Sequence, residues 1–366
     1  MERDSALRTL RELLAPLTEE GTALTREEAR AALVAMLSGT VPEVEAAALL
    51  TALATRGELA PELAGFVDEM RARATPVPLS DDERERLVDI VGTGGGRRTT
   101  FNVSSGAAIV AAGAGALVAK HGNRAITGRV GSADVLEALG VPITLEPALA
   151  AECLRETGFV FLFAPHLHPA MKAVGPLRRA LGFRTIFNLC GPLTNPAKAR
   201  AQVIGVLAPS RALLLARTLL ELKTERTAFV VNGTDGLDEL TTTAESIVVK
   251  VEEGRDGADY KMSAARTTPE MAGVPRATMD ELAGGDAQEN AAILYDIVTG
   301  IKGPKREIVL LNASAALVAA GMAVDLKEGV GLAAEAIDSG EAAGTLAKLR
   351  RFGEKWGKGQ GKGNMD

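Results

Sequence analysis

From about residue 79 onward, short apolar runs alternate with helical patterns, and this alternation restricts the fold more than any other feature of the sequence. The apolar runs cover residues 87–91, 117–119, 160–163, 203–207, 228–231 and 247–251. The helical patterns cover residues 106–114, 133–139, 212–222, 290–298 and 308–320. Strands that alternate with helices are typical of α/β packing on a mostly parallel central sheet. The sequence therefore predicts a larger α/β domain over residues 79–366, ending in a Gly/Lys-rich tail (355–366) that we expect to be disordered.

The first 78 residues contain helical patterns only. Thr25 and Glu28 have the spacing of a capping box, and Thr40 and Glu43 repeat that spacing before a run rich in Ala and Leu. A third helical pattern covers residues 58–74, and the Thr-Pro-Val-Pro stretch at 75–78 stops helix formation. The sequence therefore predicts a small all-helical N-terminal domain over residues 1–78.

Composition and charge exclude several classes of protein. Among 366 residues there are 41 Lys and Arg against 47 Asp and Glu, and the net charge of −6 argues against broad nucleic-acid binding. No apolar run approaches the ~18 residues of a membrane span, and the charged N-terminus does not resemble a signal peptide. Cys153 and Cys190 lie far apart in a pattern typical of buried free thiols. We therefore expect a cytoplasmic protein with neither a membrane nor a nucleic-acid partner.

A glycine-rich stretch, residues 92–96, directly follows the first apolar run. Glycines let the backbone approach a ligand closely, and a helix that follows offers free N–H groups to a phosphate. Ser104 and Ser105 precede the helical run and lie where N-cap hydroxyls belong. The stretch is not a dinucleotide fingerprint, because Arg97 stands in place of the third glycine. A tight turn and a phosphate site are both open on these residues, and the nearby Thr, Asn and Ser favour phosphate.

A second polar stretch, residues 120–127, follows the next apolar run. The carboxyl ends of parallel strands face one crevice, so Lys120 and Arg124 can reach an anion held by the first loop. A solvated polar loop is the alternative.

Two later stretches carry further candidate ligands. His166 and His168 precede Arg178, and because no third metal ligand has suitable spacing, an arginine that binds an aromatic carboxylate fits better than zinc. Asp238 and Glu239 follow the run at 228–231 and offer the oxygen ligands that Mg²⁺ prefers, although acidic turns without a metal are commoner.

In their order along the chain, these stretches resemble the anthranilate phosphoribosyltransferase family. The matching motifs are GTGG (92–95), NVSS (102–105), KHGNR (120–124), GSADVLEALG (131–140), HPAMK (168–172), RTIFNLCGPLTNPA (184–197) and DGLDEL (235–240). Pyrimidine-nucleoside phosphorylases share the architecture, but HPAMK and DGLDE favour the anthranilate enzymes. The resemblance implies transfer of the 5-phosphoribosyl group of PRPP (5-phosphoribosyl 1-pyrophosphate) to anthranilate in tryptophan biosynthesis, with release of pyrophosphate.

The resemblance also implies an architecture and a set of site residues. It implies that helices around residues 168–190 return to the helical domain, that the site lies between the domains, and that the helical domain forms a homodimer. The implied PRPP-binding residues are Gly92, Gly95, Gly96, Thr100, Asn102, Val103, Ser104, Ser105, Lys120, His121, Gly122, Asn123, Arg124, Ala125, Ile126, Thr127, Gly128 and Ser132. The implied anthranilate-binding residues are Gly92, Asn123, His168 and Arg178, and the implied ligands of Mg²⁺, expected as two ions, are Ser104, Asp238 and Glu239.

One position departs from the family pattern, and one role stays open. This chain has Gly96 where the family generally has Asp, which affects efficiency more than reaction type. His121 either takes the surplus proton of the amine or only shapes the pocket; we favour the second, because an aromatic amine is already neutral and nucleophilic. The alternatives are a pyrimidine-nucleoside phosphorylase and a catalytically weak nucleic-acid-binding relative, and the second would lack Asp238 and Glu239.

Overall fold

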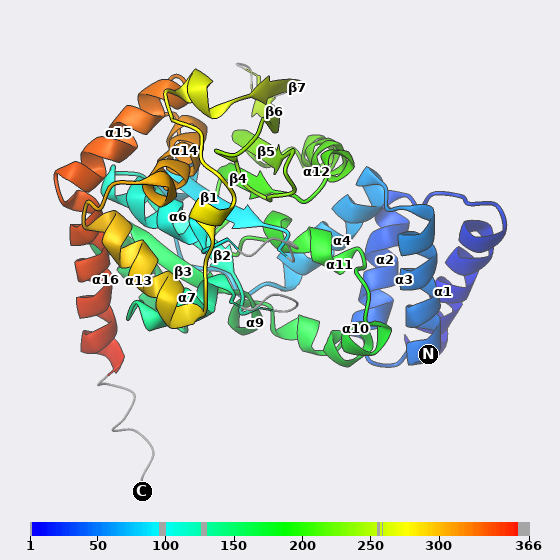
Figure 1. The fold of residues 1–366 in the computed structure, drawn as a ribbon. Helices are drawn as coiled ribbons and strands as arrows, with labels where there is room; N and C mark the ends of the chain where they lie inside the picture. The colour runs from blue at the N-terminus through cyan, green and yellow to red at the C-terminus, as the bar shows by residue number, and fades with distance from the viewer. Residues whose placement is uncertain (1, 95–99, 126–129, 255–256, 258, 358–366) are drawn as a thin grey trace, which may run out of the picture.

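The computed structural model describes residues 2–94, 100–125, 130–254, 257 and 259–357, and it shows a helical bundle beside a larger α/β part (Figure 1). One hydrophobic core lies between the sheet and the C-terminal helices, and a second joins the N-terminal helices to the opposite face of the sheet. The predicted fold class, a small helical domain and a larger α/β domain, is therefore confirmed. None of the described helices is long and apolar enough to cross a membrane.

Four helices form the N-terminal bundle: α1 (Glu2–Glu19), α2 (Arg26–Leu37), α3 (Glu43–Arg56) and α4 (Ala60–Arg73). The capping box predicted at Thr25 and Glu28 is confirmed, with the Thr25 hydroxyl accepting the Glu28 N–H. The second predicted capping box is wrong. Pro42 holds the N-cap position of α3 without a side-chain cap, because its fixed φ of −58° lets the helix begin at the next residue. Thr40 instead pairs with the Ser38 hydroxyl, 2.7 Å away.

A later segment of the chain packs against this bundle. It contains the 3₁₀ turn η1 (Pro169–Lys172), α10 (Gly175–Leu181), α11 (Phe187–Cys190) and the 3₁₀ turn η2 (Gly191–Leu193). The Phe187 ring meets the Phe66 ring of α4 edge to face, with centroids 5.5 Å apart, and Leu177 lies in the same core. This packing brings residues 168–193 close to the carboxyl ends of the central strands.

The sheet has seven strands in the order β3-β2-β1-β4-β5-β6-β7. Their bounds are β1 (Leu87–Gly92), β2 (Leu117–Gly122), β3 (Phe159–Phe163), β4 (Ala201–Gly205), β5 (Thr227–Gly233), β6 (Ser246–Glu253) and β7 (Tyr260–Thr267). The first five are parallel, as the sequence predicted, and β6 and β7 add an antiparallel edge. The sequence did not predict β7, because most of its residues are exposed and it lacks an apolar run.

Helices cover both faces of the sheet (Figure 1). The α/β part contains α5 (Asp81–Arg86), α6 (Val103–Gly113), α7 (Ser132–Ala138), α8 (Pro147–Thr157), α9 (Ala164–Leu167), α12 (Pro209–Leu222), α13 (Ala287–Val298), α14 (Pro304–Ala319), α15 (Leu326–Asp338) and α16 (Glu341–Gly357), with 3₁₀ turns η3 (Pro269–Ala272) and η4 (Asp280–Leu282). Residues of α6 and α14 lie in one core, and residues of α12 and α4 lie in the other. Because α16 continues to Gly357, the prediction of disorder from residue 355 is wrong for its first three residues; 358–366 lie outside the described residues.

Gly65 of α4 lies so close to α2 that a side chain does not fit. A Cβ atom there would lie 2.2 Å from the Arg26 carbonyl oxygen and 2.8 Å from the Arg30 amide nitrogen. We expect Gly65→Ala to lower the free energy of unfolding by about 1–3 kcal/mol, because the two helices must separate.

Gly331→Ala on α15 is the matched control, because an added Cβ there meets nothing within 4 Å. It should raise stability by about 0.5–1 kcal/mol, since alanine restricts the unfolded chain. Urea unfolding measures both variants, and similar midpoints for the two would contradict the close contact at Gly65.

Candidate functional site

The carboxyl ends of β1, β2, β4 and β5 meet at one edge of the sheet, and the loop after β5 crosses it at close range. A Cβ at Gly92 would lie 2.8 Å from Asp238 Oδ2, and a Cβ at Gly205 would lie 1.6 Å from the Asp238 carbonyl oxygen. Only glycine leaves this space at the ends of β1 and β4. These two glycines therefore let Asp238 and Glu239 lie directly over the strand ends.

Buried polar side chains fix the loop that carries this acidic pair. Asn312 of α14 accepts the Leu240 N–H at 3.0 Å and donates to the Leu240 carbonyl at 2.8 Å. On the other side, Asp235 accepts a hydrogen bond from the Thr241 hydroxyl at 2.5 Å. Asn312 was not predicted from the sequence, although an Asn within the apolar run 308–320 is a signal for a buried polar contact. The position of the pair is thus set by tertiary contacts.

The surroundings of the acidic pair disfavour two ionised carboxyl groups side by side. Burial and the neighbouring Asp238 raise the pKa of Glu239 well above its usual range, and burial raises the pKa of Asp238 as well. The side-chain oxygen Oε2 of Glu239 is buried and has no hydrogen-bond partner among the described residues. An unpartnered carboxylate oxygen beside a second carboxylate suits a hard divalent cation, and Mg²⁺ commonly binds one or two carboxylates together with substrate phosphates. The residues present therefore fit a magnesium ion.

Lys120 brings one positive charge to this edge from within the sheet. Its side chain is only 2% exposed, and its ammonium donates to the Ile90 carbonyl and, at 3.3 Å, to the Ser104 hydroxyl. Burial lowers the pKa of Lys120 to about 8, although the carboxylates of Asp89, Glu239 and Asp238 act in the opposite direction. At neutral pH the ammonium is therefore still mostly charged.

The start of α6 differs from the sequence prediction. Asn102, not Ser104 or Ser105, holds the N-cap position, because Val103 already has helical geometry. Asn102 Oδ1 accepts a hydrogen bond from Asn290 of α13 at 3.1 Å. Ser105 and Val103 are fully buried, so their side chains pack inward, and their backbone N–H groups already donate to the Asn102 and Phe101 carbonyls. Ser104 alone among the three presents its side chain towards Lys120.

The loop after β2 is partly engaged with α7. Arg124 contacts Asp134 at 2.8 Å and Glu137 at 2.9 Å, and its guanidinium lies 5.8 Å from the centre of the Phe163 ring. The Ser132 hydroxyl donates to the Asn123 carbonyl at 3.2 Å. The expectation that Arg124 reaches an anion therefore requires its guanidinium to exchange these carboxylates for a ligand.

Two histidines lie side by side between the strand ends and the segment 191–197. The rings of His121 and His168 have centroids 5.1 Å apart. His121 Nδ1 lies 3.1 Å from the Gly191 carbonyl oxygen, which only accepts, so Nδ1 carries the proton and Nε2 is a free acceptor. The Nε2 atoms of both rings are buried without a partner among the described residues. Burial lowers the pKa of His121 to about 3 and that of His168 to about 4, so both rings are neutral at pH 7.

Two arginines approach the same region from the segment that packs on the bundle. Arg178 of α10 is half-buried, and its guanidinium lies 5.3 Å from the centre of the Phe187 ring. Burial lowers the pKa of Arg178, and no carboxylate forms an ion pair with it among the described residues. Arg184 donates a hydrogen bond to the Gly94 carbonyl, and its charge acts on Asp238. Arg184 was not among the site residues predicted from the sequence.

The structure thus brings together most of the predicted site residues and separates one. His166 lies outside the group, with its Nε2 3.3 Å from Glu146 at the surface. Five predicted PRPP-binding residues lie outside the described residues: Gly95, Gly96, Ile126, Thr127 and Gly128. Arg97 also lies outside them.

The family comparisons agree with both parts of the fold. The description "Glycosyl transferase family, helical bundle domain" matches residues 11–74, and "Glycosyl transferase family, a/b domain" matches residues 84–343. A protein of Methylorubrum extorquens named anthranilate phosphoribosyltransferase is 49% identical over 333 residues, which cover 91% of this chain and 96% of that protein. One of the same name from Thermomicrobium roseum is 47% identical over 330 residues, covering 90% and 93%.

Solved structures give the same answer. The anthranilate phosphoribosyltransferase of Thermus thermophilus has a TM-score of 0.84 and 43% identity, covering 93% of this chain and 99% of its own. That of Saccharomyces cerevisiae, in complex with PRPP and Mg, has a TM-score of 0.85 and 26% identity, covering 95% and 98%. A helical bundle and an α/β domain that both match one enzyme class define a two-domain glycosyl transferase. Within that class, the chain belongs to the anthranilate phosphoribosyltransferase family.

The two neutral histidines predict a pH dependence of stability. An unfolded histidine has a pKa of about 6.5, above the values of about 3 for His121 and about 4 for His168. As the pH falls below about 6.5 the unfolded state binds protons first, so stability present at neutral pH is lost down to about pH 4 for His168 and about pH 3 for His121. At pH 5 each ring should lower the free energy of unfolding by about 2 kcal/mol relative to pH 7.

His121→Gln tests this without removing the polar group. The variant should lose about 2 kcal/mol less stability than the wild type between pH 7 and pH 5, because one of the two protons is no longer taken up. Urea unfolding at both pH values measures the difference. An equal loss in the two proteins would show that His121 is not held neutral.

Proposed function

We propose that this protein transfers the 5-phosphoribosyl group from PRPP to anthranilate, giving N-(5-phosphoribosyl)anthranilate and pyrophosphate in tryptophan biosynthesis. The observation that supports this best is where the polar groups lie. An acidic pair with one unpartnered oxygen and a buried ammonium lie at the same strand ends as two neutral histidines and Arg178, which has no ion pair among the described residues. The first group suits a diphosphate with its metal, and the second suits an aromatic amine that carries a carboxylate.

PRPP would occupy the edge formed by the ends of β1 and β2 and the start of α6. The start of α6 has the partial positive charge of a helix N-terminus, which favours an anion, and Lys120 and Ser104 add a charge and a hydroxyl. Asp238, Glu239 and Ser104 would hold Mg²⁺, which we propose binds as two ions together with PRPP. Bound magnesium supplies positive charge that stabilises the leaving pyrophosphate. The further PRPP contacts implied by the family resemblance belong to this proposal.

Anthranilate would lie between the histidine pair and α10. Arg178 has a planar guanidinium that matches a carboxylate and no competing ion pair among the described residues. Gly92 and Asn123 complete the proposed contacts. Neutral rings of His121 and His168 would accept N–H bonds from the amine and exclude water from the reacting carbon.

The chemistry requires positioning more than proton removal. The anomeric carbon loses pyrophosphate through an oxocarbenium-like state, while the amine nitrogen forms the new bond and then releases its surplus proton to the departing pyrophosphate or to solvent. Ordered approach of the two reactants is worth up to ~7–11 kcal/mol in favourable systems. A histidine with a pKa of about 3 is a weak general base at pH 7, which supports a pocket-shaping role for His121 rather than proton transfer.

We further propose a homodimer formed through the helical bundle, in the cytoplasm. The family resemblance supports this proposal, and Val34 and Val44 of the bundle are exposed apolar side chains, at 40% and 71%. Sedimentation equilibrium tests the dimer, and a monomeric mass at micromolar concentration would contradict it.

The activity test uses the acidic pair. With PRPP, Mg²⁺ and anthranilate, the wild type should consume anthranilate, seen as loss of its fluorescence. Asp238→Asn with Glu239→Gln should lower turnover by about 10³-fold or more, because about 4 kcal/mol of charge stabilisation is lost. Glu245→Gln, at an exposed carboxylate paired with Arg266, is the control and should keep full activity.

Two results would count against the proposal. Normal turnover by the double variant at limiting Mg²⁺ would remove the pair from the mechanism. Phosphate-dependent cleavage of a pyrimidine nucleoside by the wild type, without anthranilate consumption, would favour a phosphorylase instead.

Arg178 should matter for one substrate only. A charge-assisted bond to the anthranilate carboxylate is worth about 1.5–3 kcal/mol, so Arg178→Ala should raise the KM for anthranilate about ten- to a hundredfold. The KM for PRPP should change much less. Arg179→Ala, at the exposed neighbouring residue, is the matched control. Equal changes in both KM values would mean that Arg178 holds the segment in place instead of binding the acceptor.

A further inference from the structure

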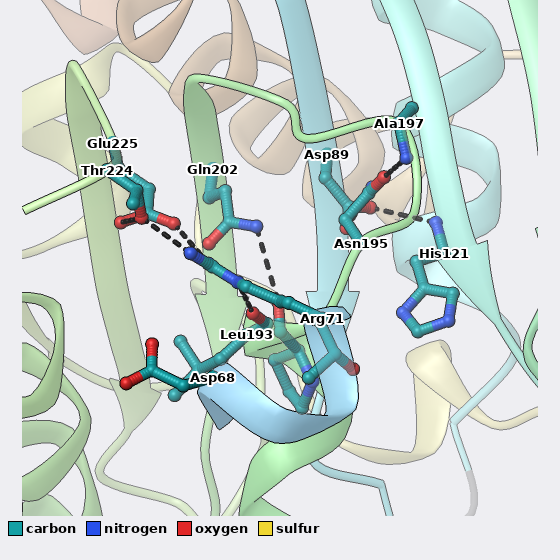
Figure 2. A network of polar contacts seen from close by, with 12 residues as sticks. Asp68, Arg71, Asp89, His121, Leu193, Asn195, Ala197, Gln202, Thr224 and Glu225 are labelled. Atoms are coloured by element: carbon teal, nitrogen blue, oxygen red, sulfur yellow. Dashed lines mark hydrogen bonds and ion pairs between the residues drawn. The ribbon is translucent and has the colours of Figure 1, made fainter. Parts of the chain in front are cut away.

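A buried carboxylate that the proposed chemistry does not use lies directly behind the histidine pair. Asp89 of β1 is 0% exposed, and its two oxygens have different partners (Figure 2). Oδ1 accepts the backbone N–H of His121 at 3.1 Å, and Oδ2 accepts Nδ2 of Asn195 at 2.8 Å. Asp89 therefore joins β2 to the segment 191–197 through one side chain.

Asn195 uses both of its donor hydrogens and its carbonyl oxygen in this arrangement. Its Nδ2 also donates to the Ala119 carbonyl at 2.8 Å, and its Oδ1 accepts the Ala197 N–H at 2.8 Å. An Asp at 195 cannot donate to either acceptor, and an Ala leaves the Asp89 oxygen without this partner. The amide therefore links β1, β2 and its own segment at once.

The segment 191–197 carries the acceptors for both histidine rings. His121 Nδ1 donates to the Gly191 carbonyl, and a ring nitrogen of His168 pairs with the backbone of Thr194. The hydrogen bond from His121 Nδ1 to the Gly191 carbonyl is therefore held on both sides. Asp89 holds the backbone of His121, and Asn195 holds the segment that contains Gly191.

We propose that Asp89 and Asn195 are positioning residues of the acceptor site, which keep His121 in its Nδ1–H tautomer and so keep its Nε2 free to accept an N–H bond from an aromatic amine. This inference rests on the proposed function, because it assigns the pair to the anthranilate side of the reaction. Neither side chain touches a substrate. The pair acts through the position of the imidazole ring.

Other contacts hold the same segment in place when Asn195 is changed (Figure 2). Gln202 of β4 donates to the Pro192 carbonyl at 3.2 Å, and Arg71 of α4 donates to the Leu193 carbonyl at 2.7 Å. Arg71 is in turn held by Glu225 at 2.7 Å. Loss of the Asp89–Asn195 bond should therefore shift the histidines without unfolding the segment.

The experiment compares Asn195→Ala, Asp89→Asn and the double variant. Asn195→Ala should raise the KM for anthranilate about tenfold, equal to one lost oriented hydrogen bond, and leave the KM for PRPP within about twofold. Because both residues act through the same bond, the double variant should be little worse than Asn195→Ala alone. Asn195→Ser, a smaller change, keeps the test usable if either variant folds poorly.

Thr157→Val is the matched control for loss of a buried hydrogen-bonding side chain. The Thr157 hydroxyl donates to the Cys153 and Phe159 carbonyls at the opposite end of the sheet. This variant should lower the melting temperature and leave both KM values unchanged.

A spectroscopic measurement tests the tautomer independently of activity. The chain has only 3 histidines, so ¹⁵N-histidine spectra resolve each ring. The wild type should show His121 protonated at Nδ1, and Asn195→Ala should show a mixture of tautomers. Unchanged histidine spectra, or equal increases in both KM values, would overturn the inference. A wild type without activity on anthranilate would overturn the proposed function, and the spectra would still decide the positioning role.

Discussion

The balance of charge around the buried ammonium of Lys120 governs the arrangement of this site. A lysine at 2% exposure inside a sheet is costly unless carboxylates lie near it. Asp89, Asp238 and Glu239 all favour its charged form, yet together they outnumber it, and burial raises the pKa of each carboxylate. Arg184 offsets part of the excess at Asp238. Burial and Asp238 raise the pKa of Glu239 most, and its unpartnered oxygen makes this corner of the site suitable for a divalent cation, which would favour the ionised form of the carboxyl group.

Backbone space makes that charge distribution possible. Lys120, Asp238 and Glu239 come together at the strand ends only because glycines leave room there. A Cβ at Gly205 would overlap the Asp238 carbonyl oxygen, and a Cβ at Gly122 would lie 2.5 Å from the Ser132 hydroxyl. Glycine at these positions is therefore required for the close approach of one chain segment to another. Gly92, Gly122 and Gly205 end β1, β2 and β4, so the requirement of the fold and the requirement of the site fall on the same residues.

The sequence predicted the features that depend on local pattern. Apolar alternation identified the five parallel strands, and the spacing of Thr25 and Glu28 identified a cap that the structure contains. Features that depend on tertiary contacts were not accessible in this way. Arg124 forms ion pairs with Asp134 and Glu137 only because α7 packs beside the loop after β2. Asn312 forms its hydrogen bonds only because α14 lies against the loop after β5. β7 was not predicted because its sequence lacks an apolar strand pattern. It is a strand because it forms backbone hydrogen bonds with β6.

The alternation of side chains along a strand explains how one pair of strands, β1 and β2, presents different polar groups on its two faces. Successive residues of a strand point to opposite faces of the sheet, so Lys120 and His121 diverge although they are adjacent. Lys120 meets Ser104 of α6 on one face, and His121 meets the segment 191–197 on the other. On β1, Ile90 packs in the core under α6, while Asp89 binds Asn195 on the histidine side. The group formed by Lys120 and Ser104 and the group formed by His121 and the segment 191–197 are thus separated by the thickness of the sheet and approach each other only at its carboxyl edge. A shift of β2 by one residue would exchange the two faces, and the register with β3, Lys120 opposite Phe161 and His121 opposite Leu162, prevents it through buried packing.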